Sequence, residues 1–137
     1  MRVLIADDHA AVRQSLAQAL EWASDVEVVG EAPDGNSAVR LTRELQPDIV
    51  IMDIVMPQLD GIEATRRIVH DCPQVHVIGL SVHASKAYAA RMLEAGASAY
   101  VLKDGDVDPL LHAMEAASGG GATLGEQIAP CDADHWS

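Results

Sequence analysis

The acidic residues of this chain best placed for chemistry come directly after short apolar runs. Asp7 and Asp8 follow the run 3–6, and Asp53 follows the run 49–52. In an open parallel sheet, the carboxyl ends of the strands meet at the edge where such sheets bind ligands. Three carboxylates in one shallow site repel one another unless a divalent cation, a raised pKa or a paired base offsets their charge. An all-oxygen site of this kind suits Mg²⁺.

Two further polar residues leave the same predicted edge. Ser81 follows the apolar run 75–80, and Lys103 follows the run 99–102. A lysine ammonium can hold a carboxylate or a phosphoryl oxygen, and a serine hydroxyl can donate to a second oxygen. With a divalent cation, these groups around Asp53 would supply what phosphoryl transfer to a carboxylate needs.

Each of these residues also has an ordinary structural explanation. Asp7 and Asp8 could cap the following helix, Asp53 could merely end a strand, Ser81 could belong to a turn, and Lys103 could be solvated. The coincidence of five such residues on one edge favours the chemical interpretation. The histidines show no ligand spacing, so we expect structural or surface roles for all of them: His9, His70, His76, His83, His112 and His135.

The elements that would position these residues alternate between apolar runs and amphipathic segments. The pattern repeats five times, which predicts parallel strands with helices on both faces of one doubly wound sheet. In such a sheet with the order 2-1-3-4-5, the strands that precede Asp7, Asp53, Ser81 and Lys103 are neighbours. The predicted strand and helix pairs are 3–6 and 10–22, 26–30 and 36–45, 49–52 and 61–69, 75–80 and 86–95, and 99–102 and 106–118.

Turn and cap residues mark the ends of these segments. Asp, Gly and Pro supply the chemistry that starts or stops a helix, and Gly can take the left-handed conformation at a helix end. The positions that predict such boundaries are Asp34 to Asn36, Pro47, Asp60 with Gly61, Gly96 and Asp106.

Length and charge limit the functions that this chain can have. Its 137 residues predict one domain over 1–118, followed by a Gly-rich tail or the start of a linker over 119–137, with no output domain. A formal charge of −12 opposes binding to nucleic acid or to an anionic membrane. We see neither a signal peptide nor a membrane span, and we expect a cytoplasmic protein whose Cys72 and Cys131 are free thiols.

From Met1 to about Ser118 the chain resembles a response-regulator receiver domain of two-component signalling. The acidic pair Asp7-Asp8, the run MDIVMP around Asp53, Ser81, and the run AYVLK that ends at Lys103 match that family. The sequence DGIEAT from Asp60 is most similar to the NarL/LuxR-type subgroup. The resemblance implies a flavodoxin-like doubly wound (βα)₅ sandwich of three layers.

The resemblance also implies residue roles and partners. Asp53 would accept a phosphoryl group from a sensor histidine kinase, with Lys103 and Ser81 assisting. Mg²⁺ would be held by Asp8, Asp53 and the backbone carbonyl of Val55, with Asp7 nearby through water. Phosphorylation would change the surface formed by the last two helices and the strand between them, and so control dimerisation and, through an output, transcription.

Ser81 and Tyr100 would form the switch pair in that family. Two positions are open for Tyr100: a ring that swings from solvent into space vacated by Ser81, or a ring packed permanently against the helix 86–95. The expected responsive surface carries Lys86, Arg91, Tyr100 and Asp104.

The chain also departs from the family pattern. Asp104 rather than proline follows Lys103, so we expect a trans bond there, and the DNA-binding helix-turn-helix of the subgroup is absent. Such a module is a switch, not an enzyme in the ordinary sense. A Mg²⁺-dependent phosphatase with an aspartyl nucleophile is the alternative, but it typically needs an acid where Val55 stands. A flavin module would need a glycine-rich phosphate loop in place of Asp7 and Asp8.

Overall fold

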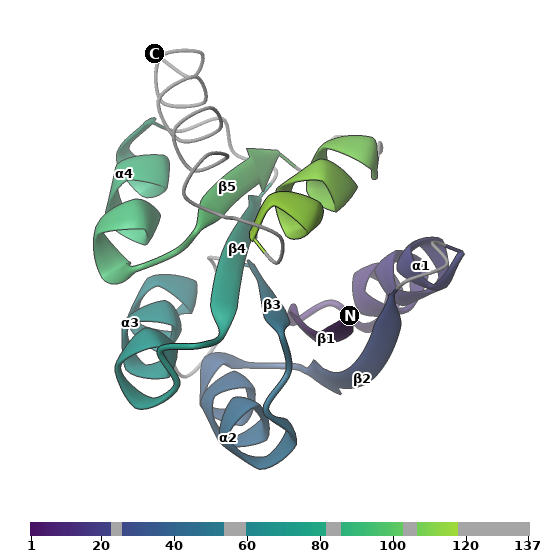
Figure 1. Ribbon diagram of the computed structural model, residues 1–137, viewed down its shortest axis with the longest axis horizontal. Coiled ribbons are helices and arrows are strands. Elements are labelled where there is room, and N and C mark those ends of the chain that lie inside the picture. The colour runs from purple at the N-terminus through teal and green to yellow at the C-terminus, as the bar shows by residue number, and fades with distance from the viewer. Residues whose placement is uncertain (23–25, 54–59, 82–85, 103–106, 118–137) are drawn as a thin grey trace.

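The computed structural model describes residues 1–22, 26–53, 60–81, 86–102 and 107–117. Strands and helices alternate along the chain, and a last helical stretch over 108–117 follows the fifth strand (Figure 1). The elements are β1 Arg2–Ala6, α1 Ala10–Glu21, β2 Glu27–Ala32, α2 Gly35–Leu45, β3 Ile49–Asp53, α3 Gly61–Asp71, β4 His76–Ser81, α4 Lys86–Ala95 and β5 Ala99–Leu102.

The strands form one parallel sheet in the order β2-β1-β3-β4-β5, as the sequence predicted. β2 ends two residues later than expected. Its last residues, Glu31 and Ala32, still pair with Ile5 and Ala6 of β1. The polar Glu31 had indicated an end to the strand, but backbone pairing with β1 continues past it.

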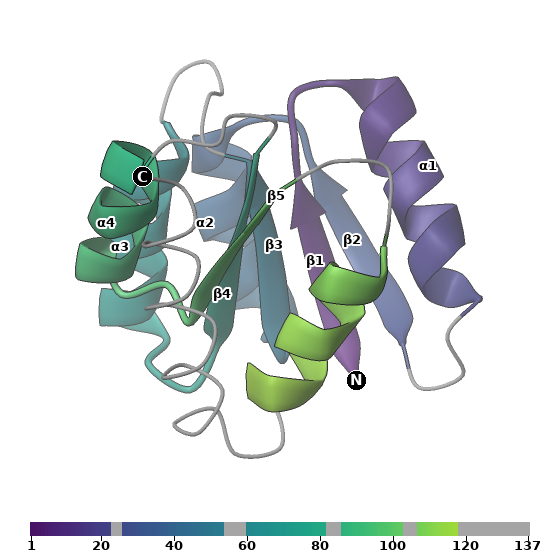
Figure 2. The ribbon, with the colours of Figure 1, turned by 90° about the horizontal axis from the view of Figure 1, so that it is seen from above.

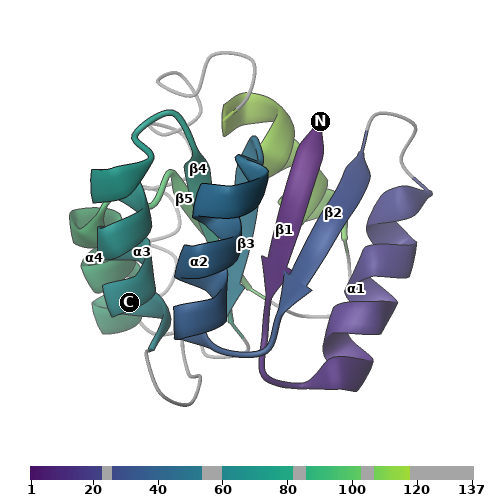
Figure 3. The same cartoon turned by 90° about the horizontal axis from the view of Figure 1, so that it is seen from below.

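Helices cover both faces of the sheet, which confirms the three-layer arrangement. Figures 2 and 3 show α2, α3 and α4 on one face, and α1 with the helix 108–117 on the other. Successive side chains of a strand point to opposite faces, so Leu4 belongs to the core under α2 to α4, whereas Val3 and Ile5 belong to the core under α1 and 108–117. The central strands are therefore apolar on both sides.

Capping residues begin or end several helices at the positions that the sequence predicted. The Asp34 carboxylate accepts a hydrogen bond from Ser37 N at 2.7 Å, and the Asp60 carboxylate accepts one from Glu63 N at 2.9 Å. Gly96 has a φ of 115°, the left-handed conformation that glycine adopts without a steric penalty. Gln46, just before Pro47, ends α2 in the same region with a φ of 49°. Asp106 lies outside the described residues.

A polar contact joins the C-terminal ends of α2 and α3. The Arg43 guanidinium donates to the Asp71 carboxylate, with Nε 2.9 Å from Oδ2. Hydrogen bonds from Arg43 and from His70 lower the pKa of Asp71 below its ordinary value. Cys72, directly after α3, is a buried free thiol, as expected, whereas Cys131 and the tail 119–137 lie outside the described residues.

None of the helices in the described part of the chain is both long and apolar enough to cross a membrane.

Gly79 in β4 leaves room for two buried side chains on the face covered by α4. A Cβ placed there would lie 2.9 Å from Met92 Cε and 3.0 Å from Tyr100 Cδ1. Both neighbours are almost fully inaccessible to solvent. Any side chain at this position would therefore displace Met92, Tyr100 or both.

We predict that Gly79→Leu lowers the free energy of unfolding by about 1–3 kcal/mol, because overpacking forces neighbouring side chains from their preferred rotamers. Urea unfolding measures the loss. Ala90→Leu is the control, since it adds a similar bulk at an exposed position of α4 and should change stability by less than about 0.5 kcal/mol. An equal effect of the two changes would contradict the packing at Gly79.

The Arg43–Asp71 pair predicts a pH-dependent contribution to stability. The folded-state pKa of Asp71 lies below its ordinary value of 3.8, so the stabilisation is fully present above that value and is lost as the pH falls through the folded-state pKa. A double-mutant cycle of Arg43→Gln and Asp71→Asn, measured by urea unfolding at pH 7 and at progressively lower pH, should show coupling that is largest at pH 7 and decreases as Asp71 becomes protonated. Coupling that does not decrease at any acidic pH at which the protein still folds would contradict an ion pair.

Candidate functional site

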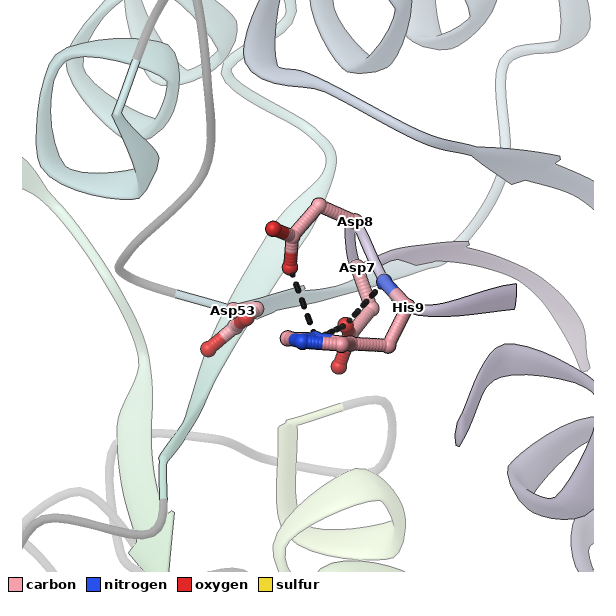
Figure 4. Close-up of side chains that lie close together, drawn as sticks. All are labelled: Asp7, Asp8, His9 and Asp53. Atoms are coloured by element: carbon pink, nitrogen blue, oxygen red, sulfur yellow. Dashed lines mark hydrogen bonds and ion pairs between the residues drawn. The ribbon is translucent and has the colours of Figure 1, made fainter. Parts of the chain in front are cut away.

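The carboxylates that follow β1 and end β3 meet at one edge of the sheet (Figure 4). One ligand atom from each of Asp7, Asp8, His9 and Asp53 lies within 4.8 Å of the others. Asp7 is buried, with 2% of its surface exposed, Asp53 is half-buried, and Asp8 is exposed. The structure therefore brings together the three acids that the sequence predicted would converge.

The turn between β1 and α1 is fixed by Arg13. Its Nη1 donates to the Asp7 backbone carbonyl at 2.6 Å, and its Nε lies 3.3 Å from the Glu31 carboxylate on β2. The Asp7 N–H also donates to the Ala32 carbonyl at 3.0 Å. Arg13 was not anticipated as a positioning residue. The sequence feature that could have indicated this role is a basic residue near the start of α1, shortly after two acids.

His9, which was expected to be a structural or surface group, turns its ring toward the acids. Its Nδ1 lies 2.9 Å from Asp8 Oδ1 and 3.3 Å from Asp7 Oδ1, and its backbone N–H donates to Asp7 Oδ1 at 2.9 Å. The side chain is 70% exposed, which agrees with a surface position. The spacing of the histidines did not predict the orientation of this ring. The position of His9 directly after two acids could have indicated it.

Ser81 and Tyr100 lie on neighbouring strands and are both buried, with 2% and 1% of their surfaces exposed. Burial raises the pKa of Tyr100, a side-chain hydrogen bond with Ser81 opposes that shift, and the charge of Asp53 adds to it. Ser81, Tyr100 and Asp53 are thus electrostatically connected. Of the two positions open for Tyr100, the structure shows the buried one.

The expected responsive surface needs one correction. Lys86 and Arg91 are exposed on α4, but Tyr100 does not reach the surface because its ring occupies the space that Gly79 leaves. Three other predicted residues, Val55, Lys103 and Asp104, lie outside the described residues, and so does the bond between Lys103 and Asp104.

The donor set of this cluster fits Mg²⁺. Asp7, Asp8 and Asp53 supply carboxylate oxygens within reach of one another, and Mg²⁺ prefers such hard oxygen ligands with water in the remaining positions. The exposure of Asp8 leaves the cluster open to solvent on one side. Asp53, at the end of β3, would be both a ligand and the most central acid of the sheet edge.

Comparison with known proteins identifies the family. Residues 3–115 match the model of the response regulator receiver domain. The transcriptional regulatory protein LiaR of Bacillus subtilis is 43% identical over 131 residues, which cover 94% of this chain and 61% of LiaR. DegU of Brevibacillus brevis is 37% identical over 128 residues, which cover 93% of this chain and 54% of DegU. The chain thus spans a little over half the length of these relatives.

Solved structures agree with the sequence comparisons. A two-component response regulator of the LuxR family from Aurantimonas has a TM-score of 0.83 and 38% identity, covering 94% of this chain and 95% of that one. The signal receiver domain of a response regulator NarL from Mycobacterium tuberculosis has a TM-score of 0.80 and 32% identity, covering 86% and 96%. The chain belongs to the response regulator receiver domain family, the phosphorylation-activated switches of two-component signalling.

Proposed function

We propose that this chain accepts a phosphoryl group on Asp53 and, through Ser81 and Tyr100, converts it into a changed surface that controls transcription. One observation supports this proposal above the others. Asp53 ends the central strand β3 within 4.8 Å of the ligand atoms of Asp7 and Asp8. A carboxylate so placed has both a cation site and access from solvent beside it.

The proposed reaction transfers the phosphoryl group from a phosphohistidine of a sensor kinase. An Asp53 carboxylate oxygen forms the new O–P bond, the P–N bond breaks, and the leaving imidazole nitrogen takes up a proton. Bound Mg²⁺ would neutralise charge on the transferred group. The residues of the chain supply the rest: Asp8, Asp53 and the backbone carbonyl of Val55 would hold the cation, with Asp7 nearby through water, and Arg13 fixes the backbone that carries Asp7. We assign to Lys103 the contact with a phosphoryl oxygen.

The proposed readout begins at Ser81, at the end of the strand next to β3. A phosphoryl group would bring up to about two negative charges and three acceptor oxygens to Asp53. The Ser81 hydroxyl can donate to one of those oxygens, which would take it from its hydrogen bond with Tyr100. Tyr100 and Met92 of α4 both lie against Gly79 in the same core, so a change at the Tyr100 hydroxyl would alter the packing under α4.

We assign the output to a surface made of α4, β5 and the helix 108–117. Lys86 and Arg91 are exposed there. Phosphorylation would favour a homodimer through this surface and so act on transcription through a DNA-binding partner or segment. The relatives named as transcriptional regulatory proteins support this output, and a charge of −12 opposes direct binding of DNA by the chain itself.

The first test concerns the acceptor. Incubation with acetyl phosphate and Mg²⁺ should add one phosphoryl group, seen by intact mass and removed by hydroxylamine. Asp53→Asn should abolish the adduct, because the amide keeps the shape of the side chain and loses the nucleophile.

Glu44→Gln is the matched control, since Glu44 is an exposed acid near the C-terminal end of α2, and it should leave the adduct intact. EDTA should prevent the adduct in every variant. A stoichiometric adduct on the Asp53→Asn protein would overturn the assignment.

The second test concerns the readout. Ser81→Ala should still accept a phosphoryl group from acetyl phosphate, because Asp53 and the cation ligands remain. It should lose most of the dimerisation that beryllofluoride, a phosphoryl mimic, induces in the wild type, as measured by analytical ultracentrifugation. Ser98→Ala is the control, since it removes a hydroxyl that contacts His76 Nδ1 at 3.0 Å, just before β5. Equal dimerisation of wild type and Ser81→Ala would remove Ser81 from the readout.

A further inference from the structure

We propose that Glu31, at the end of β2, is a positioning residue for the cation site. It acts through Arg13, whose guanidinium holds the peptide bond between Asp7 and Asp8. This inference deepens the proposed function and rests on it, because the cation is the one that phosphoryl transfer to Asp53 requires. Glu31 itself supplies no ligand. Its role is to keep the guanidinium in the orientation that fixes the turn after β1.

The contacts of the Arg13 guanidinium are the first argument. Its Nη1 donates to the Asp7 carbonyl at 2.6 Å, and its Nε donates to Glu31 Oε1 at 3.3 Å. A guanidinium is planar and presents its N–H groups in a fixed fork, so a contact at Nε sets the direction in which Nη1 points. The Arg13 side chain is only 16% exposed, against 37% for Glu31. Glu31 therefore orients a mostly buried arginine.

The carbonyl that Arg13 binds is the second argument, because it belongs to the peptide unit that joins Asp7 to Asp8. A peptide unit is planar, so a hydrogen bond to its carbonyl restrains the plane that contains both Cα atoms. The N–H of Asp7 is held as well, since it donates to the Ala32 carbonyl at 3.0 Å. The backbone of Asp7 is thus fixed from β2 on both sides, directly by Ala32 and through Arg13 by Glu31.

The length of β2 is the third argument. The strand continues past its apolar run, and its last residues, Glu31 and Ala32, pair with Ile5 and Ala6 of β1. Figures 2 and 3 show α1 beside β2, so a side chain at the end of this strand can meet one near the start of the helix. The two residues that extend β2 are the same two that hold the turn.

A positioning role and a purely electrostatic role of Arg13 predict effects of opposite sign. A positive charge near three carboxylates opposes the binding of a divalent cation, so its removal would strengthen Mg²⁺ binding if charge alone mattered. Groups that orient metal ligands instead contribute about 10- to 100-fold to metal affinity. Weaker Mg²⁺ binding after removal of the guanidinium therefore indicates positioning.

The experiment measures Mg²⁺ binding to the full-length protein by isothermal titration calorimetry, after urea unfolding has established that each variant is folded under these conditions. Arg13→Met should lower Mg²⁺ affinity about tenfold. Arg13→Lys should lower it nearly as much, because an ammonium keeps the charge but not the fork. Glu31→Ala should lower the affinity about fivefold on its own, and should have no further effect in the Arg13→Met protein.

A second readout separates positioning of the cation site from a general loss of structure. The rate of phosphorylation by acetyl phosphate is measured as a function of Mg²⁺ concentration. In Glu31→Ala the half-saturating Mg²⁺ concentration should rise by the same factor as the dissociation constant. The rate at saturating Mg²⁺ should stay within about twofold of the wild type, because Asp53 is unchanged. A disturbed fold would lower the rate at every Mg²⁺ concentration.

Arg40 and Glu44 supply the matched control. They form another arginine–glutamate pair, with Arg40 Nε 3.9 Å from Glu44 Oε1, on α2 rather than at the turn after β1. Arg40→Met and Glu44→Ala repeat the same chemical changes there. Neither should change Mg²⁺ affinity by more than about twofold, because exposed charges are screened by salt.

The outcomes separate this inference from the proposed function. Tighter Mg²⁺ binding by Arg13→Met, unchanged binding by Glu31→Ala, or losses that add in the double variant would overturn the inference and leave the phosphoryl adduct on Asp53 standing. An equal loss in Arg40→Met would also overturn it. A wild type that binds Mg²⁺ but forms no adduct would overturn the proposed function alone. A wild type that binds no Mg²⁺ would overturn this inference together with the cation site.

Discussion

The repulsion among Asp7, Asp8 and Asp53 is the constraint on which the functional edge of this fold depends. β1 and β3 are neighbours in register, with Ala6 opposite Met52, so the residues that follow them are delivered to the same place. Both strands are apolar on both faces and packed into two cores, and the backbone cannot shift to separate the charges. The packing of the core thus holds the three carboxylates together although their charges repel one another. A bound cation would offset this repulsion.

The turn after β1 limits this repulsion without removing it. Asp7 is almost inaccessible to solvent, and its Oδ1 accepts a hydrogen bond from the His9 backbone N–H and lies within reach of the His9 ring. Burying a neutral polar group without a hydrogen-bond partner costs roughly 2–7 kcal/mol, and burying an unpaired carboxylate costs more. Arg13 binds the backbone carbonyl of Asp7, which fixes the position from which the Asp7 side chain reaches the cluster.

Much of this structure follows from patterns that are local in the sequence. The strands were predicted from apolar runs, and the caps Asp34, Asp60 and Gly96 from the needs of single helix ends. The burial of Tyr100 was not decided by its own neighbours in the chain, because it depends on the absence of a side chain at Gly79 on the adjacent strand. The orientation of His9 was missed for a similar reason: it is a choice of rotamer that depends on where Asp7 and Asp8 point.

The burial of Tyr100 changes how a signal at Asp53 would travel. A ring that begins in solvent needs vacated space, whereas a ring already buried in the same core as Met92 needs only a change in its hydrogen bond or its contacts. Met92 lies in the core under α3 and α4, where its Sδ is 3.8 Å from Thr65 Oγ1 of α3. Since close-packed cores transmit displacement rather than absorb it, the hydroxyl of Ser81 would control a connected set of side chains from β4 to α3 and α4. A switch that starts from this buried position would change the packing around Tyr100.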